Sequence, residues 1–194
     1  MLVEGESDRA AIKAIAGLKK VDFESLGVAV LPVSSKNNID RPGAIFLSLE
    51  IPVYAIWDCD RKGETIEGED TNRALQRLFG SAEQEISAAS TRIEDGFACF
   101  EGNLEQTLAN ELGTADFAAA IEAAKQQFSI QRKDDACKSP AVMEFALTKL
   151  SDEGLRSASL ESILEKICAL KAKHSVPLEM SQGDANEFGQ TLVG

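Results

Sequence analysis

The stretch VYAIWDCD (53–60) consists of five apolar residues followed by Asp58, Cys59 and Asp60. A short apolar run of this kind is typical of a strand that is buried on both faces of a parallel sheet. Two carboxylates at positions i and i+2 of such a strand would lie on one face, with Cα atoms ~6.5–7 Å apart. Because no basic residue separates them, their charge must be balanced from elsewhere.

The residues around this stretch alternate between strand and helix patterns. Leu2 and Val3 form a short apolar start, and Ser7-Asp8 is the predicted N-cap of the helix that follows. The pattern predicts further strands over 27–33, 53–57 and 96–101, and further helices over 41–50 and 71–79, the last ended by Gly80. Such alternation predicts an α/β fold with a mostly parallel sheet flanked by helices.

The second half of the sequence changes character. The segments NLEQTLANEL (103–112), TADFAAAIEAAKQQF (114–128), SPAVMEFALTKL (139–150) and SLESILEKICALKAK (159–173) all have helical periodicity. We therefore expect an α/β domain over residues 1–101 and an all-helical domain over residues 102–194. Because the chain begins almost inside its first strand, we also expect it to be part of a longer protein.

Composition excludes several classes of protein. Of the 194 residues, 44% are hydrophobic and 27% are charged, as in ordinary globular domains. No apolar run approaches a membrane span and no signal peptide is recognisable, so we expect a cytoplasmic protein. The four cysteines show no CxxC spacing, which argues against a zinc ribbon. Because His174 is the single histidine, multi-histidine zinc sites are excluded, and hydrolytic chemistry would rest on carboxylates, lysines and metal ions.

The formal net charge of −12 is spread evenly along the sequence. Residues 1–100 and residues 101–194 each carry a net charge of −6. A domain that binds DNA tightly on its own usually has a basic surface, and no basic run is present. The charge is compatible with a nuclease site in which divalent cations offset clustered acids.

Acidic residues are expected to gather at one edge of the sheet. Glu4 follows the first strand, Gly5 permits a sharp turn, Asp8 falls in the next helix, and Asp58 and Asp60 follow the third strand. The carboxyl ends of parallel strands form the ligand crevice of such folds, and oxygen-rich sites suit magnesium. Taken singly, Asp8 could serve only as an N-cap, and Asp58 and Asp60 could simply begin a loop. Together these acids have no evident local structural role, which favours a metal site.

These motifs resemble the Toprim fold, whose signature is an EGxSD-like turn and a DxD pair on a later strand. Here the turn is LVEGESD (2–8) and the pair lies in VYAIWDCD (53–60). Together with PVSSKNNI (32–39), the motifs are most similar to those of OLD (overcoming lysogenization defect) endonucleases, in which a Toprim nuclease region follows an ABC-type ATPase. The resemblance covers about the first 105 residues, and the helical half matches only in outline.

The resemblance implies a metal-dependent endonuclease that uses two Mg²⁺ ions, for which Mn²⁺ could substitute. By position, the acidic ligands would be Glu4, Asp8, Asp58 and Asp60. The stretch FEGNLEQTL (100–108) offers one further ligand, and we prefer Glu105 to Glu101 because Glu105 falls in the first turn of a helix.

The resemblance also implies a basic residue that stabilises the transition-state phosphate. Lys138 in CKSP (137–140) matches that position, although it could equally be a solvated surface lysine. Lys36 follows the second strand, where other Toprim proteins have a glycine-rich loop, so its role stays open.

Two metal ions bound by carboxylates could hold a scissile phosphate, activate a water molecule and stabilise the leaving oxygen. The implied partners are a DNA substrate and an ATPase region N-terminal to this sequence, through which the protein could oligomerise. A topoisomerase would need a reactive tyrosine, and Tyr54 is the single tyrosine and lies in an apolar strand. A recombination mediator would need a cysteine cluster, and a dehalogenase-like phosphatase would need threonine where Lys62 stands. A non-catalytic scaffold that docks an ATPase remains an alternative, and the sequence leaves DNA or RNA preference, cleavage specificity and pathway open.

Overall fold

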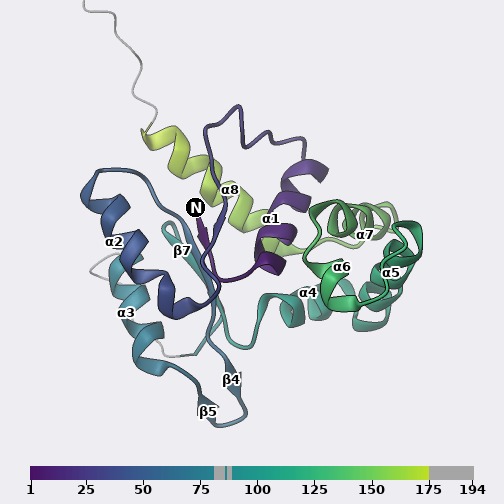
Figure 1. Cartoon of the computed structure of the whole chain (residues 1–194), viewed down its shortest axis with the longest axis horizontal. Helices are drawn as coiled ribbons and strands as arrows, with labels where there is room; N and C mark the ends of the chain where they lie inside the picture. The colour runs from purple at the N-terminus through teal and green to yellow at the C-terminus, as the bar shows by residue number, and fades with distance from the viewer. Residues whose placement is uncertain (81–85, 87–88, 175–194) are drawn as a thin grey trace, which may run out of the picture.

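The fold is built on a five-stranded sheet, seen in a computed structural model that describes residues 1–80, 86 and 89–174 (Figure 1). Its strand order is β2-β1-β3-β7-β6, and every neighbouring pair is parallel except β6 and β7. The strands are β1 (Leu2–Val3), β2 (Leu31–Pro32), β3 (Ala55–Asp58), β6 (Arg92–Ile93) and β7 (Phe97–Phe100). The apolar stretch that begins at Val53 therefore supplies the central strand, as its two-sided burial requires.

Eight α-helices are present in the described part of the chain. They are α1 (Glu6–Leu18), α2 (Asp40–Ser48), α3 (Glu69–Phe79), α4 (Leu104–Leu112), α5 (Thr114–Gln127), α6 (Lys133–Cys137), α7 (Pro140–Asp152) and α8 (Ala158–His174). A 3₁₀ turn, η1 (Lys36–Asn38), precedes α2, and a small antiparallel hairpin of β4 (Arg61–Lys62) and β5 (Thr65–Ile66) follows β3. No described helix has both the length and the apolarity that crossing a membrane requires.

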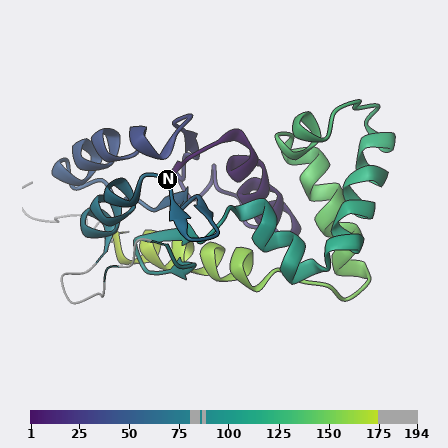
Figure 2. The same cartoon turned by 90° about the horizontal axis from the view of Figure 1, so that it is seen from below.

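Helices cover both faces of the sheet (Figure 2). On one face, α2 and α3 enclose a core that contains Trp57, whose ring lies 5.1 Å from the Phe97 ring centroid. On the other face, Ile56 and Phe100 pack with α1, α8 and the remaining helices. Alternate residues of the central strands thus point into two separate cores, and this requirement fixes the register of these strands.

The second core continues without interruption into the helical half. Apolar residues of α1 share it with those of α5, α7 and α8. Helices α1 and α7 approach closely at Gly17, where an added Cβ atom would lie only 2.7 Å from Glu144 Oε1. The division into domains at residue 102 stays a prediction, and any such domains would share this core.

Several predicted elements have different bounds in the structure. The strand expected over 27–33 is reduced to Leu31–Pro32, and Gly27 adopts a φ of +67° before it. The helix expected to begin at Ser7-Asp8 begins at Glu6, with Gly5 as its N-cap. The segment expected to be a loop after Asp58 contains the β4–β5 hairpin, and β6 and α6 were not predicted. The last twenty residues, 175–194, lie outside the described residues.

Candidate metal centre

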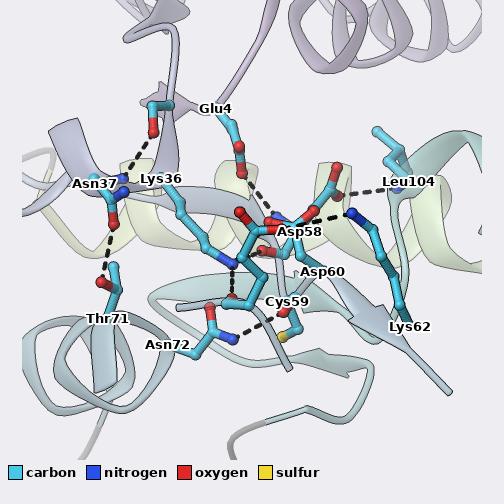
Figure 3. A network of polar contacts seen from close by, with 12 residues as sticks. Glu4, Lys36, Asn37, Asp58, Cys59, Asp60, Lys62, Thr71, Asn72 and Leu104 are labelled. Carbon is cyan, nitrogen blue, oxygen red and sulfur yellow. Dashed lines mark hydrogen bonds and ion pairs between the residues drawn. The ribbon is translucent and has the colours of Figure 1, made fainter. Parts of the chain in front are cut away.

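The ends of β1 and β3 bring Glu4 and Asp58 together. The two strands are parallel neighbours, with Val3 opposite Ile56. Glu4 N–H donates to the carbonyl of Ile56 at 3.1 Å, and Asp58 N–H donates back to Glu4 Oε2 at 3.1 Å (Figure 3). The adjacency of these strands, on which the predicted acidic cluster depended, is therefore present.

Asp8 reaches the same edge from the first turn of α1. Its side chain is buried, and Oδ2 accepts a hydrogen bond of 2.8 Å from Gly5 N–H. Asp8 therefore closes the turn between β1 and α1 from within the helix and does not occupy the N-cap position itself. The same carboxylate lies close enough to Asp58 to raise that residue's pKa.

The two acids of the DxD pair point in different directions. Strand β3 ends at Asp58, whose Oδ1 accepts a 3.0 Å hydrogen bond from Leu104 N–H at the start of α4. Asp60 lies beyond the strand with a φ of +56°, in the left-handed region. The prediction that both carboxylates share one strand face is therefore wrong, because the chain leaves the pleat between them.

Lys36 balances part of this negative charge. Its side chain is buried, and its ammonium donates to Asp60 Oδ2 at 2.8 Å, to the Asp58 carbonyl at 3.2 Å and to the Glu67 carbonyl at 2.6 Å (Figure 3). It is the one buried basic side chain in the part of the chain that the structure describes. Lys36 thus holds the DxD turn and the end of the β4–β5 hairpin together.

Sequence analysis missed Asn72, which supports the DxD turn from α3. Asn72 is fully buried, and its Nδ2 donates to the Cys59 carbonyl at 3.0 Å. Its position three residues before Leu75 and seven before Phe79 places it on the buried face of α3. A polar residue at an apolar position of the helical repeat was the available signal.

Burial of the acids disfavours their charged forms. Burial, followed by the neighbouring carboxylates of Asp8 and Glu4, raises the pKa of Asp58 to about 8. Burial also raises the pKa of Asp8 to about 6 and, together with the charge of Asp60, raises the pKa of Glu4. The main cause of these shifts is loss of solvation, and repulsion among the carboxylates adds to it.

The donor set suits a hard divalent cation, although a metal would require rearrangement. Among residues 1–80, 86 and 89–174, no three carboxylate, imidazole or thiol side chains are already arranged to hold a metal ion. One oxygen of each acid instead accepts a hydrogen bond from the protein, and Asp60 does so from Lys36. Four clustered carboxylates with one lysine leave excess charge that Mg²⁺ could offset through oxygen ligands.

The two site residues predicted in the helical half have other surroundings. Glu105 lies in the first turn of α4 and forms an ion pair with Lys133 of α6. Lys138 is exposed at the end of α6. Within the described residues, no hydrogen bond or ion pair joins either of them to the four acids. Glu101, the alternative to Glu105, pairs with Arg61 at 2.9 Å.

Comparison with known proteins shows what the N-terminal part of the chain is similar to. Residues 1–60 match the family model "Overcoming lysogenization defect protein-like, TOPRIM domain". No curated protein sequence matches the chain.

Solved structures extend the likeness over most of the chain. The C-terminal region of the Burkholderia pseudomallei OLD protein aligns with a TM-score of 0.61 and 20% identity, covering 87% of this chain and 96% of that one. The C-terminal region of the Xanthomonas campestris pv. campestris OLD protein aligns with a TM-score of 0.55 and 20% identity, covering 89% and 95%. The predicted fold class, a mostly parallel Toprim-like sheet flanked by helices, is confirmed. The chain therefore contains an OLD-like Toprim domain, and its fold is that of the C-terminal region of OLD proteins.

Proposed function

We propose that the chain is a magnesium-dependent DNA endonuclease and the catalytic region of a larger protein that also contains an ATPase. The observation that carries this proposal is the largely desolvated cluster of Glu4, Asp58 and Asp60 after the adjacent strands β1 and β3, joined by buried Asp8 of α1. The pKa values of Glu4, Asp8 and Asp58 are raised, first by burial and then by neighbouring carboxylates, and such shifts are typical of functional sites. The OLD-like Toprim domain supports a nuclease as that function.

The four acids would be the ligands of the metal ions, with Glu105 as a further candidate. Two bound divalent cations would supply a Lewis acid for the scissile phosphate and a nucleophilic hydroxide near neutral pH. The chain itself holds Asp58 in place through Leu104 N–H and holds the DxD turn through Asn72.

A cation from the chain would offset charge on the transition state. Lys138 is the candidate that the family resemblance supplies, and Lys36 is the candidate that the structure places among the acids. Lys36 forms an ion pair with Asp60. If metal ions took over Asp60, the ammonium would become available to a phosphate oxygen.

Plasmid cleavage with Mg²⁺, Mn²⁺ or Ca²⁺ tests the proposal directly. We expect nicking with Mg²⁺ and Mn²⁺, and loss of activity in Asp58→Ala. Asp152→Ala, at an exposed position at the end of α7, is the control and should cleave like wild type. Equal cleavage by Asp58→Ala and wild type would contradict the proposed centre. Metal binding without cleavage under any condition would favour the scaffold alternative.

Two further variants in the same assay separate the roles proposed for the helical half. Glu105→Gln should weaken metal binding and cleavage together if Glu105 is a ligand. Lys138→Ala should leave metal binding unchanged and slow cleavage by ~10²–10³-fold, the scale for loss of one electrostatic stabiliser. If Lys138→Ala cleaves DNA at the wild-type rate, stabilisation of the transition-state phosphate would be assigned to Lys36 instead.

A further inference from the structure

A polar hollow lies beside the acidic cluster, between the β4–β5 hairpin and α4. Its volume is about 450 Å³. The side chains that line it include Arg61, Thr91, Asn103, Gln106, Thr107 and Asn110. We call it the α4 hollow.

The walls of the α4 hollow are bonded to the DxD turn. Asp60 N–H donates to the Gly102 carbonyl at 3.3 Å, and Arg61 N–H donates to the Glu101 carbonyl at 2.9 Å. Leu104, which follows Asn103 of the hollow, donates its N–H to Asp58 Oδ1. A nucleic-acid strand bound at Asp58 and Asp60 would therefore extend into the α4 hollow.

One face of α4 supplies uncharged hydrogen-bonding groups. Asn103, Gln106 and Asn110 recur at helical spacing on the face opposite the buried Leu104 and Leu108. Asn103 Oδ1 accepts the helix-capping hydrogen bond from Gln106 N–H at 2.7 Å, which leaves its NH₂ group as a donor. The Gln106 carboxamide lies over Gly102, since a Cβ atom there would be 2.5 Å from Oε1.

Charge in the α4 hollow is confined to one exchangeable pair. Arg61 Nη1 lies 2.9 Å from Glu101 Oε1, and both side chains are about half exposed. An exposed pair of this kind contributes little stability, so a phosphate could replace the carboxylate at small cost. The lining includes no aromatic residue, which removes the usual platform for stacking bases.

We propose that the α4 hollow binds the sugar–phosphate backbone of the DNA strand next to the scissile phosphate. Amides, hydroxyls and an arginine are the groups that bind DNA backbones without reading sequence. The hollow would give a chain with a net charge of −12 a means of holding DNA that depends little on salt. This inference rests on the proposed nuclease function and assigns Gln106, Asn110 and Arg61 as substrate-positioning residues.

A matched pair of isosteric substitutions tests the inference. Gln106→Glu places a negative charge in the hollow, and Gln127→Glu places the same charge at an exposed position at the end of α5. Cleavage of a short DNA duplex in Mg²⁺ gives KM and kcat, and fluorescence anisotropy in Ca²⁺ gives Kd. Gln106→Glu should raise KM and Kd about tenfold, as expected for replacing a favourable contact of ~1 kcal/mol with repulsion, and should change kcat little. Gln127→Glu should match wild type.

Salt dependence separates the two kinds of contact. Gln106→Ala should raise Kd without changing the slope of log Kd against log salt concentration. Arg61→Gln should reduce that slope by about 0.9, the value for one phosphate contact on duplex DNA, and Arg61→Lys should restore it.

The experiment distinguishes an error in the proposal about the α4 hollow from an error in the proposed nuclease function. If wild type cleaves and Gln106→Glu behaves like Gln127→Glu, the inference about the hollow is overturned and the nuclease stands. If wild type binds DNA without cleaving it and Gln106→Glu weakens binding, the hollow stands and the nuclease fails. If wild type neither binds nor cleaves, both are overturned.

Discussion

Lys36 is a buried basic side chain that contacts the acidic centre directly. Its ammonium bonds to Asp60 and to two backbone carbonyls, one of them in the β4–β5 hairpin segment. A divalent cation that binds Asp60 must compete with this ammonium. We therefore expect Lys36 to compete with a bound metal ion, and its removal to have opposite effects on the metal-free and the metal-bound protein.

Replacement of Lys36 by methionine tests this competition. Without metal, Lys36→Met should lower the free energy of unfolding by about 2–3 kcal/mol, because buried acceptors and carboxylates lose their partner. With Mg²⁺, the variant should gain more in melting temperature than wild type does, because the competing ammonium is gone. Thermal unfolding with and without Mg²⁺ measures both effects.

Lys62→Met provides the control for this substitution. Lys62 is highly exposed and pairs with Glu67 at 3.5 Å, so its loss should change stability by no more than ~0.5 kcal/mol. A smaller Mg²⁺ response in Lys36→Met than in wild type would show that Lys36 assists metal binding and does not oppose it.

Residue identity could be predicted at this centre better than side-chain geometry. Position after apolar strands selected Glu4, Asp58 and Asp60, and position in the first turn of the next helix selected Asp8; the structure brings these four acids together. The left-handed backbone conformation of Asp60 could not be predicted from the sequence. It goes with tertiary contacts of the DxD turn, among them the ion pair with Lys36. Lys36 was named as a candidate cation whose role stayed open.

At the scale of elements, the long and periodic segments were predictable and the short ones were not. Helices α3, α5, α7 and α8 carry sustained apolar repeats and lie close to their predicted positions. Strands β4, β5 and β6 have two residues each, too few for any alternation to be read. Strands β4 and β5 pair only with each other, and β6 pairs with β7 at the edge of the main sheet.

The junction between β5 and α3 allows a prediction about how an element supports the site. Gly68 has a φ of +68°, and a Cβ atom there would lie 2.9 Å from Lys36 Cε. Gly63, in the hairpin turn, has a φ of +64°, and its Cβ would meet no atom within 4 Å. Substitution of either glycine by alanine should cost about 1–2 kcal/mol for the left-handed conformation.

Only Gly68→Ala should also displace Lys36. We therefore expect urea unfolding to show a larger loss of stability for Gly68→Ala than for Gly63→Ala, and only Gly68→Ala to alter the response to Mg²⁺. Equal losses of stability in the two variants would indicate that the Lys36 side chain can move away from the new methyl group without loss of stability, and that the junction does not position it.

At the scale of the whole molecule, the helical half supports the Toprim sheet. Leu104 N–H fixes Asp58, and α7 and α8 share a core with α1. Glu111 of α4 further bonds Ser157 and Ser159 at the start of α8. Helical periodicity predicted these helices, but it could not predict their common core with the sheet, because which helix faces meet is decided by three-dimensional packing.

We propose that the clustered carboxylates of this molecule bind divalent metal. Replacing Asp58 by asparagine retains an oxygen for Leu104 N–H but removes the charge whose pKa is raised to about 8. Because that raised pKa means that the charged form destabilises the metal-free fold, Asp58→Asn should melt higher than wild type at pH 8 without metal. Metal should then raise the melting temperature of wild type but not that of Asp58→Asn.

The most direct test is the melting temperature of wild type and Asp58→Asn at pH 8, with and without saturating Mg²⁺, with Asp152→Asn as the control. At about 100 times Kd, Mg²⁺ should raise the wild-type melting temperature by about 5–10 °C, and it should raise that of Asp152→Asn equally. Asp58→Asn should show little or no rise. An equal rise in Asp58→Asn and wild type, or no rise in either, would contradict the metal centre.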